Sequence, residues 1–382
     1  MIQRIFSVAF AAVVACAQTP TTGIEPRPVE TKPAQARWEL KYLYDEDDSS
    51  LILLDLEFPS PRRGIASGTI VQNSRSKNVV VITADGGNTW SIVPVKEPGH
   101  SLFFLNESVG WMVTSKNIWK TVESGRSWKK IPKTPKLVRR VHFLDEANGY
   151  ALCGLKSVYT TADGGATWNL LPASQEPSAN PEYTAYEAVD FQGPRGLIAG
   201  WSSPPRRESR LPDWMEPEKA KLRREWPTMN IVLETLDGGK NWKTSTAPIF
   251  GRISRIDVAG DSRGLALLAF RNAFEVPSAV ISIDSKTGKS DTVYSNRNRK
   301  VTDLLLSKSG SAYLAAIEAI PALPNSPVPG KLKIIRSNDF SVWEEMEVDY
   351  RASGTYAMLA APDDKNLWVA TNTGAILKLS GI

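Results

Sequence analysis

Three aspartates stand in nearly identical eight-residue settings and are the first candidates for chemistry in this chain. The segments read TADGGNTW at 83–90, TADGGATW at 161–168 and TLDGGKNW at 235–242, and a weaker copy, TVESGRSW, occupies 121–128. An aspartate beside paired glycines invites a catalytic or metal-binding interpretation. The alternative is a tight turn, in which Asp85 folds back onto nearby amides while Gly86 and Gly87 take backbone angles that other residues resist. We expect the turn.

Each segment is predicted to join two strands, with the closing tryptophan, Trp90 in the first copy, beginning the return strand and placing a large ring in the core. The pattern Ser/Thr-x-Asp-x-Gly-x-Thr-Trp resembles the Asp-box, or BNR repeat, of sialidase-like β-propellers, and this resemblance covers most of the chain from about Trp38. The residues predicted to have this structural role are Thr83, Asp85, Gly87, Trp90, Glu123, Gly125, Trp128, Asp163, Gly165, Trp168, Asp237, Gly239 and Trp242.

Other catalytic and metal-binding patterns were sought and do not occur in the sequence. Of the two histidines, His100 and His142, neither belongs to a Cys/His/Asp spacing typical of a metal site. No glycine-rich loop opens a helix after a strand, and no nucleophile-elbow motif is present. Sialidases carry an Arg-Ile-Pro motif before the first box, whereas the residues before Thr83 read KNVVVI. We therefore predict no catalytic residue, no metal and no cofactor.

The N-terminus is typical of an exported lipoprotein. Arg4 precedes an apolar run, Ile5 to Val14, that is too short for a permanent membrane span. The sequence that ends at Cys16, VVAC, resembles the bacterial lipobox, in which the cysteine is lipid-modified and becomes the first residue. We predict a signal peptide at 1–15, a Thr/Pro-rich tether at 16–36, and a periplasmic or cell-surface protein anchored to a bacterial membrane through Cys16. An ordinary signal peptide, with a secreted soluble product, is the alternative.

The second cysteine, Cys153, lies in the apolar run YALCGL. If Cys16 is acylated, no disulfide can form within the chain. Because nothing basic stands near Cys153 in the sequence, we expect a buried structural thiol rather than a nucleophile.

The segments between the boxes repeat an apolar strand, a polar turn, a glycine and a second apolar strand, as in 101–114 and 140–154. Alternating polarity and regularly spaced turn residues predict antiparallel strands. The box tryptophans at 90, 128 and 168 are 38 and 40 residues apart, the period of propeller blades. We predict a single all-β domain at 37–382, a seven-bladed β-propeller of four-stranded antiparallel blades, with six or eight blades as alternatives. The strand WELKYLY at 38–44 is expected to close the last blade.

The strand order also predicts which end of the propeller binds a partner. In a four-stranded meander the boxes join strands three and four at one end, whereas the insertions at 202–229, 270–277 and 320–330 join strands two and three at the other. Long loops on a rigid scaffold commonly carry binding sites. The largest insertion contains EPEKAKLRREW, predicted as a short amphipathic helix that starts near Pro217.

Basic and aromatic residues gather at this insertion end, and arginine and tryptophan are common interface anchors. The alternative is a helix that caps an exposed edge, with the charges merely solvated. The net charge of +5 does not point to nucleic acid. The predicted partner-binding residues are Arg206, Arg207, Arg210, Trp214, Arg223, Arg224, Trp226, Arg297, Arg299 and Lys300.

The whole repeat unit resembles the photosystem II stability/assembly factor family, most clearly in NESVGWMV with SGRSW and in DEANGYAL with DGGATW. The resemblance implies an exported propeller, lipidated in some bacteria, that binds partner proteins through a surface with an arginine patch and without catalysis. We predict a non-enzymatic protein-binding or assembly scaffold; the alternative is a carbohydrate-active enzyme of the sialidase or Asp-box glycosidase type. Several arginines with a Tyr/Glu pair at the channel mouth would favour the enzyme, and an Arg/Trp rim would favour the scaffold.

Overall fold

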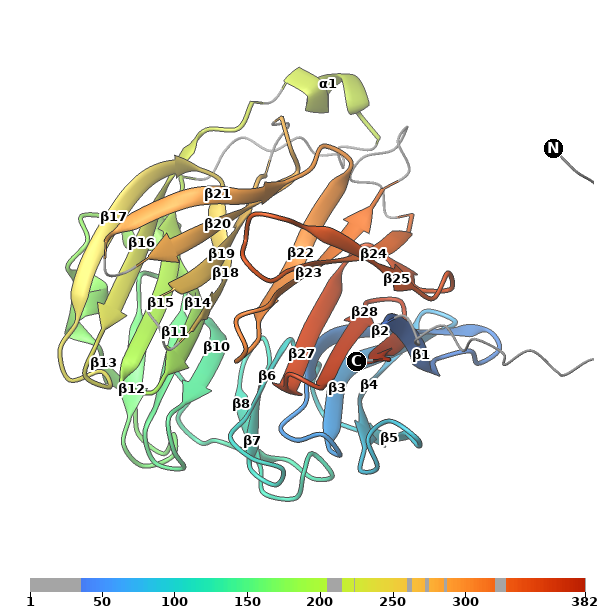
Figure 1. The fold of residues 1–382 in the computed structure, drawn as a ribbon. Coiled ribbons are helices and arrows are strands. Elements are labelled where there is room, and N and C mark those ends of the chain that lie inside the picture. The colour runs from blue at the N-terminus through green and yellow to red at the C-terminus, as the bar shows by residue number, and fades with distance from the viewer. Residues whose placement is uncertain are drawn as a thin grey trace, which may run out of the picture. The chain divides into compact units, whose positions relative to one another are not determined.

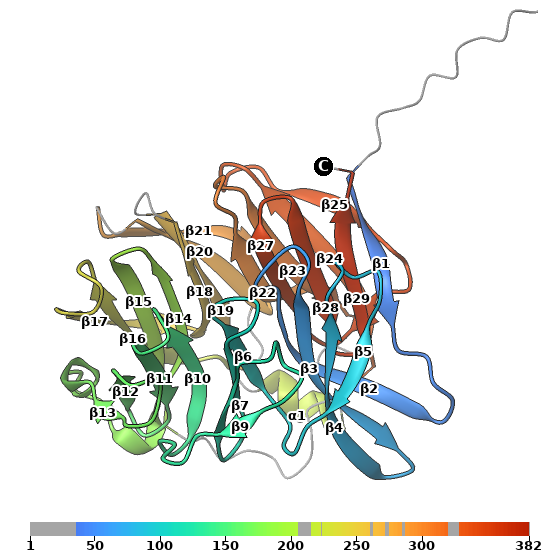
Figure 2. The ribbon, with the colours of Figure 1, turned by 90° about the horizontal axis from the view of Figure 1, so that it is seen from below.

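A computed structural model describes residues 36–204, 215–222, 224–259, 263–271, 275–284, 287–319 and 328–381. The predicted signal peptide, Cys16 and the tether therefore lie outside the described residues. From Ala36 onward the strands form a ring of antiparallel blades around a central channel (Figures 1 and 2). Each blade is a four-stranded meander whose first strand lines the channel and whose fourth strand is outermost. This is the all-β, seven-bladed propeller that the repeats predicted.

Blades one to three contain the first three box segments and the two repeat segments at 101–114 and 140–154. Their strands are β2 (Ser49–Glu57), β3 (Gly64–Gln72), β4 (Arg75–Thr83) and β5 (Ser91–Pro94) in blade one; β6 (Ser101–Phe104), β7 (Gly110–Val113), β8 (Ile118–Thr121) and β9 (Lys129–Lys130) in blade two; and β10 (Val138–Phe143), β11 (Gly149–Cys153), β12 (Val158–Thr161) and β13 (Asn169–Leu170) in blade three. Two short 3₁₀ turns, η1 (Pro172–Gln175) and η2 (Pro181–Tyr183), lead to blade four.

Blades four to seven carry the insertions. Blade four has a complete box at 235–242, and the later blades do not. Their strands are β14 (Thr184–Gln192), β15 (Arg195–Ser202), β16 (Pro227–Thr235) and β17 (Lys243–Phe250) in blade four; β18 (Arg252–Val258), β19 (Arg263–Ala269), β20 (Ser278–Asp284) and β21 (Lys289–Ser295) in blade five; β22 (Arg299–Leu306), β23 (Ala312–Glu318), β24 (Gly330–Ser337) and β25 (Glu344–Val348) in blade six; and β27 (Ala357–Asp363), β28 (Asn366–Thr371) and β29 (Ala375–Ser380) in blade seven. A two-residue strand, β26 (Ser353–Gly354), pairs with β24. The predicted helix is α1 (Pro217–Leu222), which ends before Trp226.

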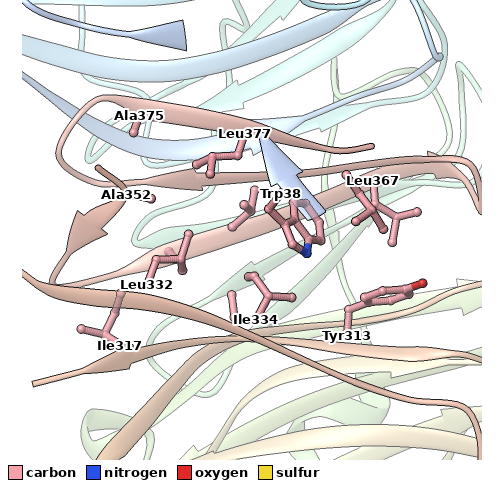
Figure 3. Close-up of a cluster of buried hydrophobic side chains, with 13 residues drawn as sticks. Trp38, Tyr313, Ile317, Leu332, Ile334, Ala352, Leu367, Ala375 and Leu377 are labelled. Carbon is pink, nitrogen blue, oxygen red and sulfur yellow. The ribbon is translucent and has the colours of Figure 1, made fainter. Parts of the chain in front are cut away.

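The N-terminal strand closes the ring, as the sequence predicted. Strand β1 (Arg37–Leu43) runs antiparallel to β29 as the fourth strand of blade seven, with Trp38 opposite Leu379. It also pairs in parallel with β25, so that blades six and seven form one continuous sheet. Trp38 is 1% exposed and packs among Tyr313, Ile334 and Leu377 (Figure 3). Closure thus removes two open sheet edges and buries the largest apolar side chain of β1.

Aromatic side chains connect neighbouring blades in a repeated arrangement. Phe58 of blade one stacks on Trp368 of blade seven with ring centroids 4.1 Å apart, and Phe143 of blade three stacks on Trp111 of blade two at 3.6 Å. In each stack, the box tryptophan of the blade that supplies the phenylalanine packs edge-on against the stacked rings, as Trp90 does against Trp368. The box therefore supplies its ring to the contact between blades, and this contact explains why a tryptophan ends each complete copy.

The inner strands position the residues that line the channel. Strands β2, β6, β10, β14, β18, β22 and β27 contact one another in a closed circuit. Several contain a bulge in the register. In β2, β10, β18 and β22 the residue that follows the bulge is charged: Asp55, Arg140, Arg255 and Asp303, while in β27 the charged residue, Asp363, ends the strand. A bulge redirects the side chains that follow it. The same local irregularity, repeated around the ring, thus brings charges of both signs into the channel.

The boxes and the insertions occupy opposite ends of the ring. The complete boxes lie between β4 and β5, β12 and β13, and β16 and β17, whereas 203–226 joins β15 to β16 and 319–329 joins β23 to β24. In a meander these two kinds of connection face opposite ends, which we call the box end and the insertion end. Each inner strand begins at the insertion end, so its first residues surround the channel opening there.

Candidate functional site

The box aspartates form turns and reach no other part of the chain. Asp85 Oδ1 accepts the Thr89 N–H at 2.9 Å, and Thr83 Oγ1 donates to the same oxygen while accepting the Gly87 N–H at 3.0 Å. Asp163 and Asp237 make the same contacts in their own boxes. Hydrogen bonds from Thr89 lower the pKa of Asp85 to about 2, and those around Asp163 and Asp237 lower their pKa values equally. Such a carboxylate stays ionised and suits a turn rather than proton transfer.

The segment SNDFSVW at 337–343 in blade six is a degenerate box, and it keeps this geometry although it lacks the glycine. Phe340 occupies the glycine position with a φ of 64°, and Trp343 Nε1 donates to its carbonyl oxygen at 3.3 Å, as Trp90 Nε1 does to that of Gly87 at 3.2 Å. Asp339 Oδ1 accepts the N–H groups of Ser341 and Val342. The side chain of Phe340 is 9% exposed, so its burial offsets the cost of a left-handed backbone.

The insertion-end opening of the channel carries a cationic and aromatic group of side chains, which we name the mouth cluster. It consists of Arg139, Glu187, Trp201, Arg252 and Lys300. Trp201 lies between two arginines, with the guanidinium carbon of Arg252 4.6 Å and that of Arg139 5.9 Å from its ring. Arg139 also forms an ion pair with Glu187 at 3.2 Å. Four of the five members lie near the beginning of inner strands, and Trp201 lies near the end of β15.

The electrostatics of the mouth cluster favour an anionic ligand. Burial, together with the nearby Arg271 and Arg139, lowers the pKa of Arg252, and burial and Arg252 lower that of Lys300. A lowered pKa in a base means that its positive charge lacks full compensation. In addition, Arg252 Nε and Trp201 Nε1 are buried and have no hydrogen-bond partner among the residues that the structure describes. An incoming carboxylate or phosphate would reduce this repulsion and give the guanidinium an acceptor.

The predicted partner-binding residues divide into three groups in the structure. Lys300 belongs to the mouth cluster, Arg297 is exposed beside it in sequence, and Trp226 is 63% exposed after α1. Arg299 instead forms ion pairs with Glu318 at 3.1 Å and Glu345 at 2.7 Å within blade six. Arg224 lies between α1 and β16. The predicted residues that lie outside the described parts of the chain are Arg206, Arg207, Arg210, Trp214 and Arg223.

Sequence reasoning missed Arg139, Trp201 and Arg252. Each arginine stands at the beginning of an inner strand, in VRRVHF and in GRISRIDV, immediately after a connection between blades. The signal that could have identified them is this position, because the first residues of inner strands must surround the insertion-end opening.

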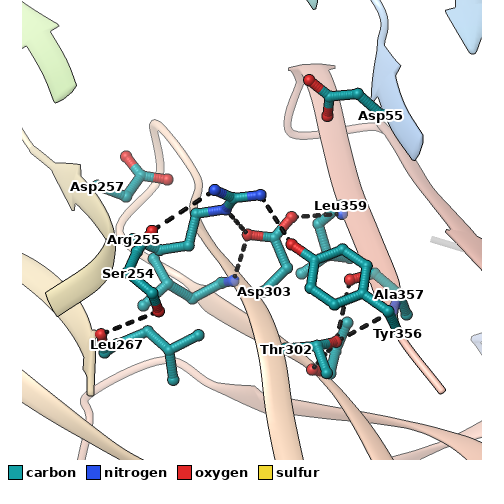
Figure 4. Close-up of polar contacts among 12 residues, drawn as sticks. Asp55, Ser254, Arg255, Asp257, Leu267, Thr302, Asp303, Tyr356, Ala357 and Leu359 are labelled. Atoms are coloured by element: carbon teal, nitrogen blue, oxygen red, sulfur yellow. Dashed lines mark hydrogen bonds and ion pairs between the residues drawn. The ribbon is translucent and has the colours of Figure 1, made fainter. Parts of the chain in front are cut away.

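Deeper in the channel, Arg255 connects three blades. Its Nε donates to Asp303 Oδ1 at 2.9 Å and a terminal nitrogen donates to the Tyr356 hydroxyl at 2.8 Å (Figure 4). Although burial opposes its charge, Tyr356, Asp303 and Asp55 raise the pKa of Arg255. Burial raises the pKa of Tyr356, so its hydroxyl stays protonated. Tyr356 is thus bonded to an arginine, and its raised pKa is the opposite of what a tyrosine nucleophile needs.

Four channel carboxylates bind the backbone of the following blade. Asp55 Oδ2 accepts the Leu102 N–H at 2.7 Å, and Asp303 Oδ2 accepts the Leu359 N–H at 2.9 Å. Asp190 and Asp257 accept the N–H groups of Val258 and Leu306. These contacts fasten each inner strand to the next, which is a structural role for most of the acidic residues in the channel.

Glu57 and Arg140 are the exceptions in the channel. Neither makes a hydrogen bond or an ion pair with any described residue. Burial and then Asp55 raise the pKa of Glu57 to about 8, and burial and Arg255 lower that of Arg140. His142 follows Arg140 on β10, and burial lowers its pKa to about 4. The channel therefore holds a carboxyl and an imidazole that are neutral at pH 7, together with a guanidinium that has no partner among the described residues.

Metal sites, membrane spans and reactive cysteines are the other kinds of functional feature to consider in the described parts of the chain. There, no three His, Cys, Asp or Glu side chains come together in a way that could hold a metal ion. No helix among the residues that the structure describes has the length and apolar character needed to cross a bilayer. Cys153 is fully buried, and burial raises the pKa of its thiol to about 12, so it is a poor nucleophile.

Comparison with known proteins supports the fold. Neither a protein-family model nor a curated protein sequence matches the chain. Among solved structures, YCF48 bound to D1 peptide superposes with a TM-score of 0.59 and 16% identity over 92% of this chain and 96% of that one. YCF48 from Cyanidioschyzon merolae gives the same score and identity over 90% and 98%. The GH74 xyloglucanase from Xanthomonas campestris matches at 0.59 and 11% identity over 90% of this chain and 53% of its own. These likenesses, at 16% identity or less, confirm the predicted propeller fold.

Proposed function

We propose that this protein is an exported, lipid-anchored propeller that binds a partner protein at the insertion end and acts as a non-enzymatic assembly scaffold. The observation that carries the proposal is the mouth cluster, where Arg139 and Arg252 lie on either side of Trp201 and two buried donors have no acceptor within the described parts of the chain. Arginine and tryptophan in a well-packed, desolvated setting are the usual anchors of a protein interface. An acidic side chain or a terminal carboxylate of the partner would supply the acceptor.

Two further observations support this proposal. A structurally similar protein, YCF48, is known with D1 peptide bound, so the same ring can present a peptide-binding surface. The ring also begins at Arg37, which pairs with Ser380 at the box end. The proposed tether would therefore join the ring at the box end.

Binding at the mouth is tested by Arg252→Ala and Trp201→Ala in capture of partners from native membranes, with crosslinking to identify them. We expect both variants to lose the specific partner while retaining their urea-unfolding midpoint within the range of the control. Arg75→Ala is the matched control, because Arg75 is an exposed arginine at the same end of the ring. Equal capture by all three variants would exclude the mouth cluster as the binding surface.

The insertion of blade four is tested by replacing 204–224 with a short Gly/Ser linker. These limits follow from the structure, because β15 ends at Ser202, β16 begins at Pro227, and the buried Glu225 accepts the Arg271 N–H at 3.0 Å. We expect the ring to fold and partner capture to fall. Global unfolding of the variant would show that the insertion is structural.

Lipid anchoring is tested by Cys16→Ser. We expect the protein to move from the membrane fraction to the soluble exported fraction and to lose incorporation of labelled fatty acid. Continued labelling of the variant would contradict the proposed anchor. The change leaves the ring itself untouched, so partner binding by the released protein should be unaltered.

A carbohydrate-active enzyme is the second candidate, and one observation favours it. Burial and then Asp55 raise the pKa of Glu57 to about 8, and Asp55 and Asp303 lie near it; a carboxyl that keeps its proton within a group of carboxyls is a feature of glycosidases. Hydrolysis of a panel of fluorogenic glycosides, lost in Glu57→Gln but retained in Arg252→Ala, would support this candidate. Absence of turnover across the panel would favour the scaffold.

A further inference from the structure

Blade two and the connection that follows it carry a larger net positive charge than the whole chain. Residues 110–136 contain seven lysines and arginines against one glutamate, a net charge of +6, whereas the complete chain carries +5. Four of these lysines, Lys129, Lys130, Lys133 and Lys136, follow within eight residues, and all four are exposed. None forms an ion pair with a described carboxylate. The basic character of the protein is thus concentrated on β9 and the connection that follows it.

A groove lies beside these lysines, between blades two and three. Its volume is about 570 Å³, in the range of sites that hold a ligand or a short peptide segment. Lys133 and Lys136 lie on one wall, Tyr159 and Trp168 provide an aromatic surface, and Leu155 lies at the insertion end. Tyr159 and Trp168 are partly buried, whereas Lys133 and Lys136 are exposed.

Two leucines are held in exposed positions at the insertion end of this groove. Leu137 is 56% exposed with a φ of 55°, and Leu155 is 48% exposed with a φ of 54°. The two residues are neighbours, because the Gly154 N–H donates to the Leu137 carbonyl at 3.0 Å. Lys156, which follows with a φ of 57°, fixes the turn by donating to the Gln175 carbonyl at 2.7 Å. Large apolar side chains in a left-handed backbone are uncommon and are maintained here by the surrounding contacts.

We propose that this groove is a second docking surface, distinct from the mouth cluster, and that its occupant is an extended acidic peptide segment that carries apolar side chains. The lysines would pair with its carboxylates, and Leu155, Tyr159 and Trp168 would contact its apolar side chains. Because the aromatic rings are partly buried while the lysines are exposed, we expect a peptide rather than a membrane in the groove. A flat bilayer surface would meet the lysines first and leave the rings out of reach, whereas a single extended chain fits between the walls.

The experiment measures fluorescence anisotropy of a fluorescein-labelled peptide of alternating glutamate and leucine, added to the purified chain at low and moderate salt. We expect saturable binding that the double variant Lys133→Glu/Lys136→Glu weakens at least tenfold and that Leu155→Ser weakens severalfold. A peptide in which glutamine replaces glutamate, and one in which serine replaces leucine, should each bind more weakly than the parent. Binding should also fall as salt rises, because the pairs are at the surface.

Lys240→Glu/Lys243→Glu is the matched control, since it reverses the same number of exposed charges on blade four. Equal loss in both double variants, or no saturable binding, would overturn the proposal. Competition by phosphatidylglycerol vesicles that displaces the peptide through the same lysines would overturn it in favour of a membrane surface. Loss in Arg252→Ala, with Lys133→Glu/Lys136→Glu unaffected, would assign the peptide to the mouth cluster. If the mouth-cluster variants kept full partner capture while the peptide still bound through Lys133 and Lys136, the groove proposal would stand although the proposed function of the mouth cluster had failed.

Discussion

Arg255 Nε on β18 donates to Asp303 Oδ1 on β22 at 2.9 Å, and Asp303 is 6% exposed. The same carboxylate accepts the N–H groups of Leu304 and Leu359, so one side chain joins blades five, six and seven. Arg255 extends the connection to Tyr356 at 2.8 Å. The charges in this part of the channel therefore stabilise the ring, and a function for the channel must rest on the groups that these bonds leave free.

Replacing Asp303 with alanine should destabilise the protein strongly. The change leaves the Arg255 charge without its ion-pair partner and two buried N–H groups without an acceptor, and removal of one partner of a buried pair typically costs about 3–5 kcal/mol. The shift in the urea-unfolding midpoint measures this loss. Asp291→Ala, at an exposed carboxylate of blade five, is the matched control and should be nearly neutral. A similar midpoint for the two variants would show that the Arg255–Asp303 pair contributes little.

Gly87→Ala should be much more damaging than Gly238→Ala, although both glycines belong to complete boxes and have positive φ values of 85° and 73°. A Cβ atom on Gly87 would lie 2.3 Å from the ring of the fully buried Trp368, whereas one on Gly238 meets nothing within 4 Å. We expect about 1 kcal/mol of destabilisation for Gly238→Ala from its backbone angle alone. The contact with Trp368 should add about 1–3 kcal/mol in Gly87→Ala. Equal unfolding midpoints would mean that Trp368 moves aside without cost.

Cys153 should not react with thiol reagents while the protein is folded. Its side chain is fully buried between blades, and burial raises the pKa of the thiol to about 12. In a Cys16→Ser background, Ellman's reagent should therefore detect no thiol in the native protein and one thiol per chain in urea, because the sequence has two cysteines. Rapid reaction of the native protein would indicate local opening of blade three.

The architecture could be predicted because its signals are local and repeated. The contacts of Asp85 with Thr89 are confined to one turn, and the spacing of Trp90, Trp128 and Trp168 reports the blade period directly. The strand that contains Trp38 could be placed because its alternation left it without any other partner. Each of these inferences uses residues close in sequence, or a period that recurs.

The candidate site could be predicted only in part, because its contacts are not local. Arg255 and Tyr356 are 101 residues apart and share no motif, and Arg255 follows a bulge in β18 whereas Tyr356 directly precedes β27. Arg299 and Lys300 stand together in the basic run SNRNRK, yet neighbouring strand residues point to opposite faces. Arg299 consequently enters ion pairs within blade six, whereas Lys300 joins the mouth cluster. A run of like charges in the sequence does not reveal such a division.

Asp190 and Asp257 should make the protein less stable as pH rises. Burial raises the pKa of Asp190 to about 6, and burial and Asp190 raise that of Asp257 well above its ordinary value. The folded chain therefore holds protons that the unfolded chain releases near pH 4, so this contribution is fully present below about pH 4 and is lost as pH rises through 6. Each extra proton changes the free energy of unfolding by about 1.4 kcal/mol per pH unit.

Asp257→Asn isolates this contribution. The amide can accept the Leu306 N–H and donate to Asp190, so it reproduces the protonated pair at every pH. We expect the stability of the variant relative to wild type to increase between about pH 4 and pH 7. Opposing contributions cancel in the comparison, because Asp163, with a pKa of about 2, and His142, with a pKa of about 4, are present in both proteins. Urea unfolding at pH 4.5, 6 and 7.5 measures the difference, and Asp291→Asn is the control. A difference that is constant across these pH values would show that Asp190 and Asp257 share no proton.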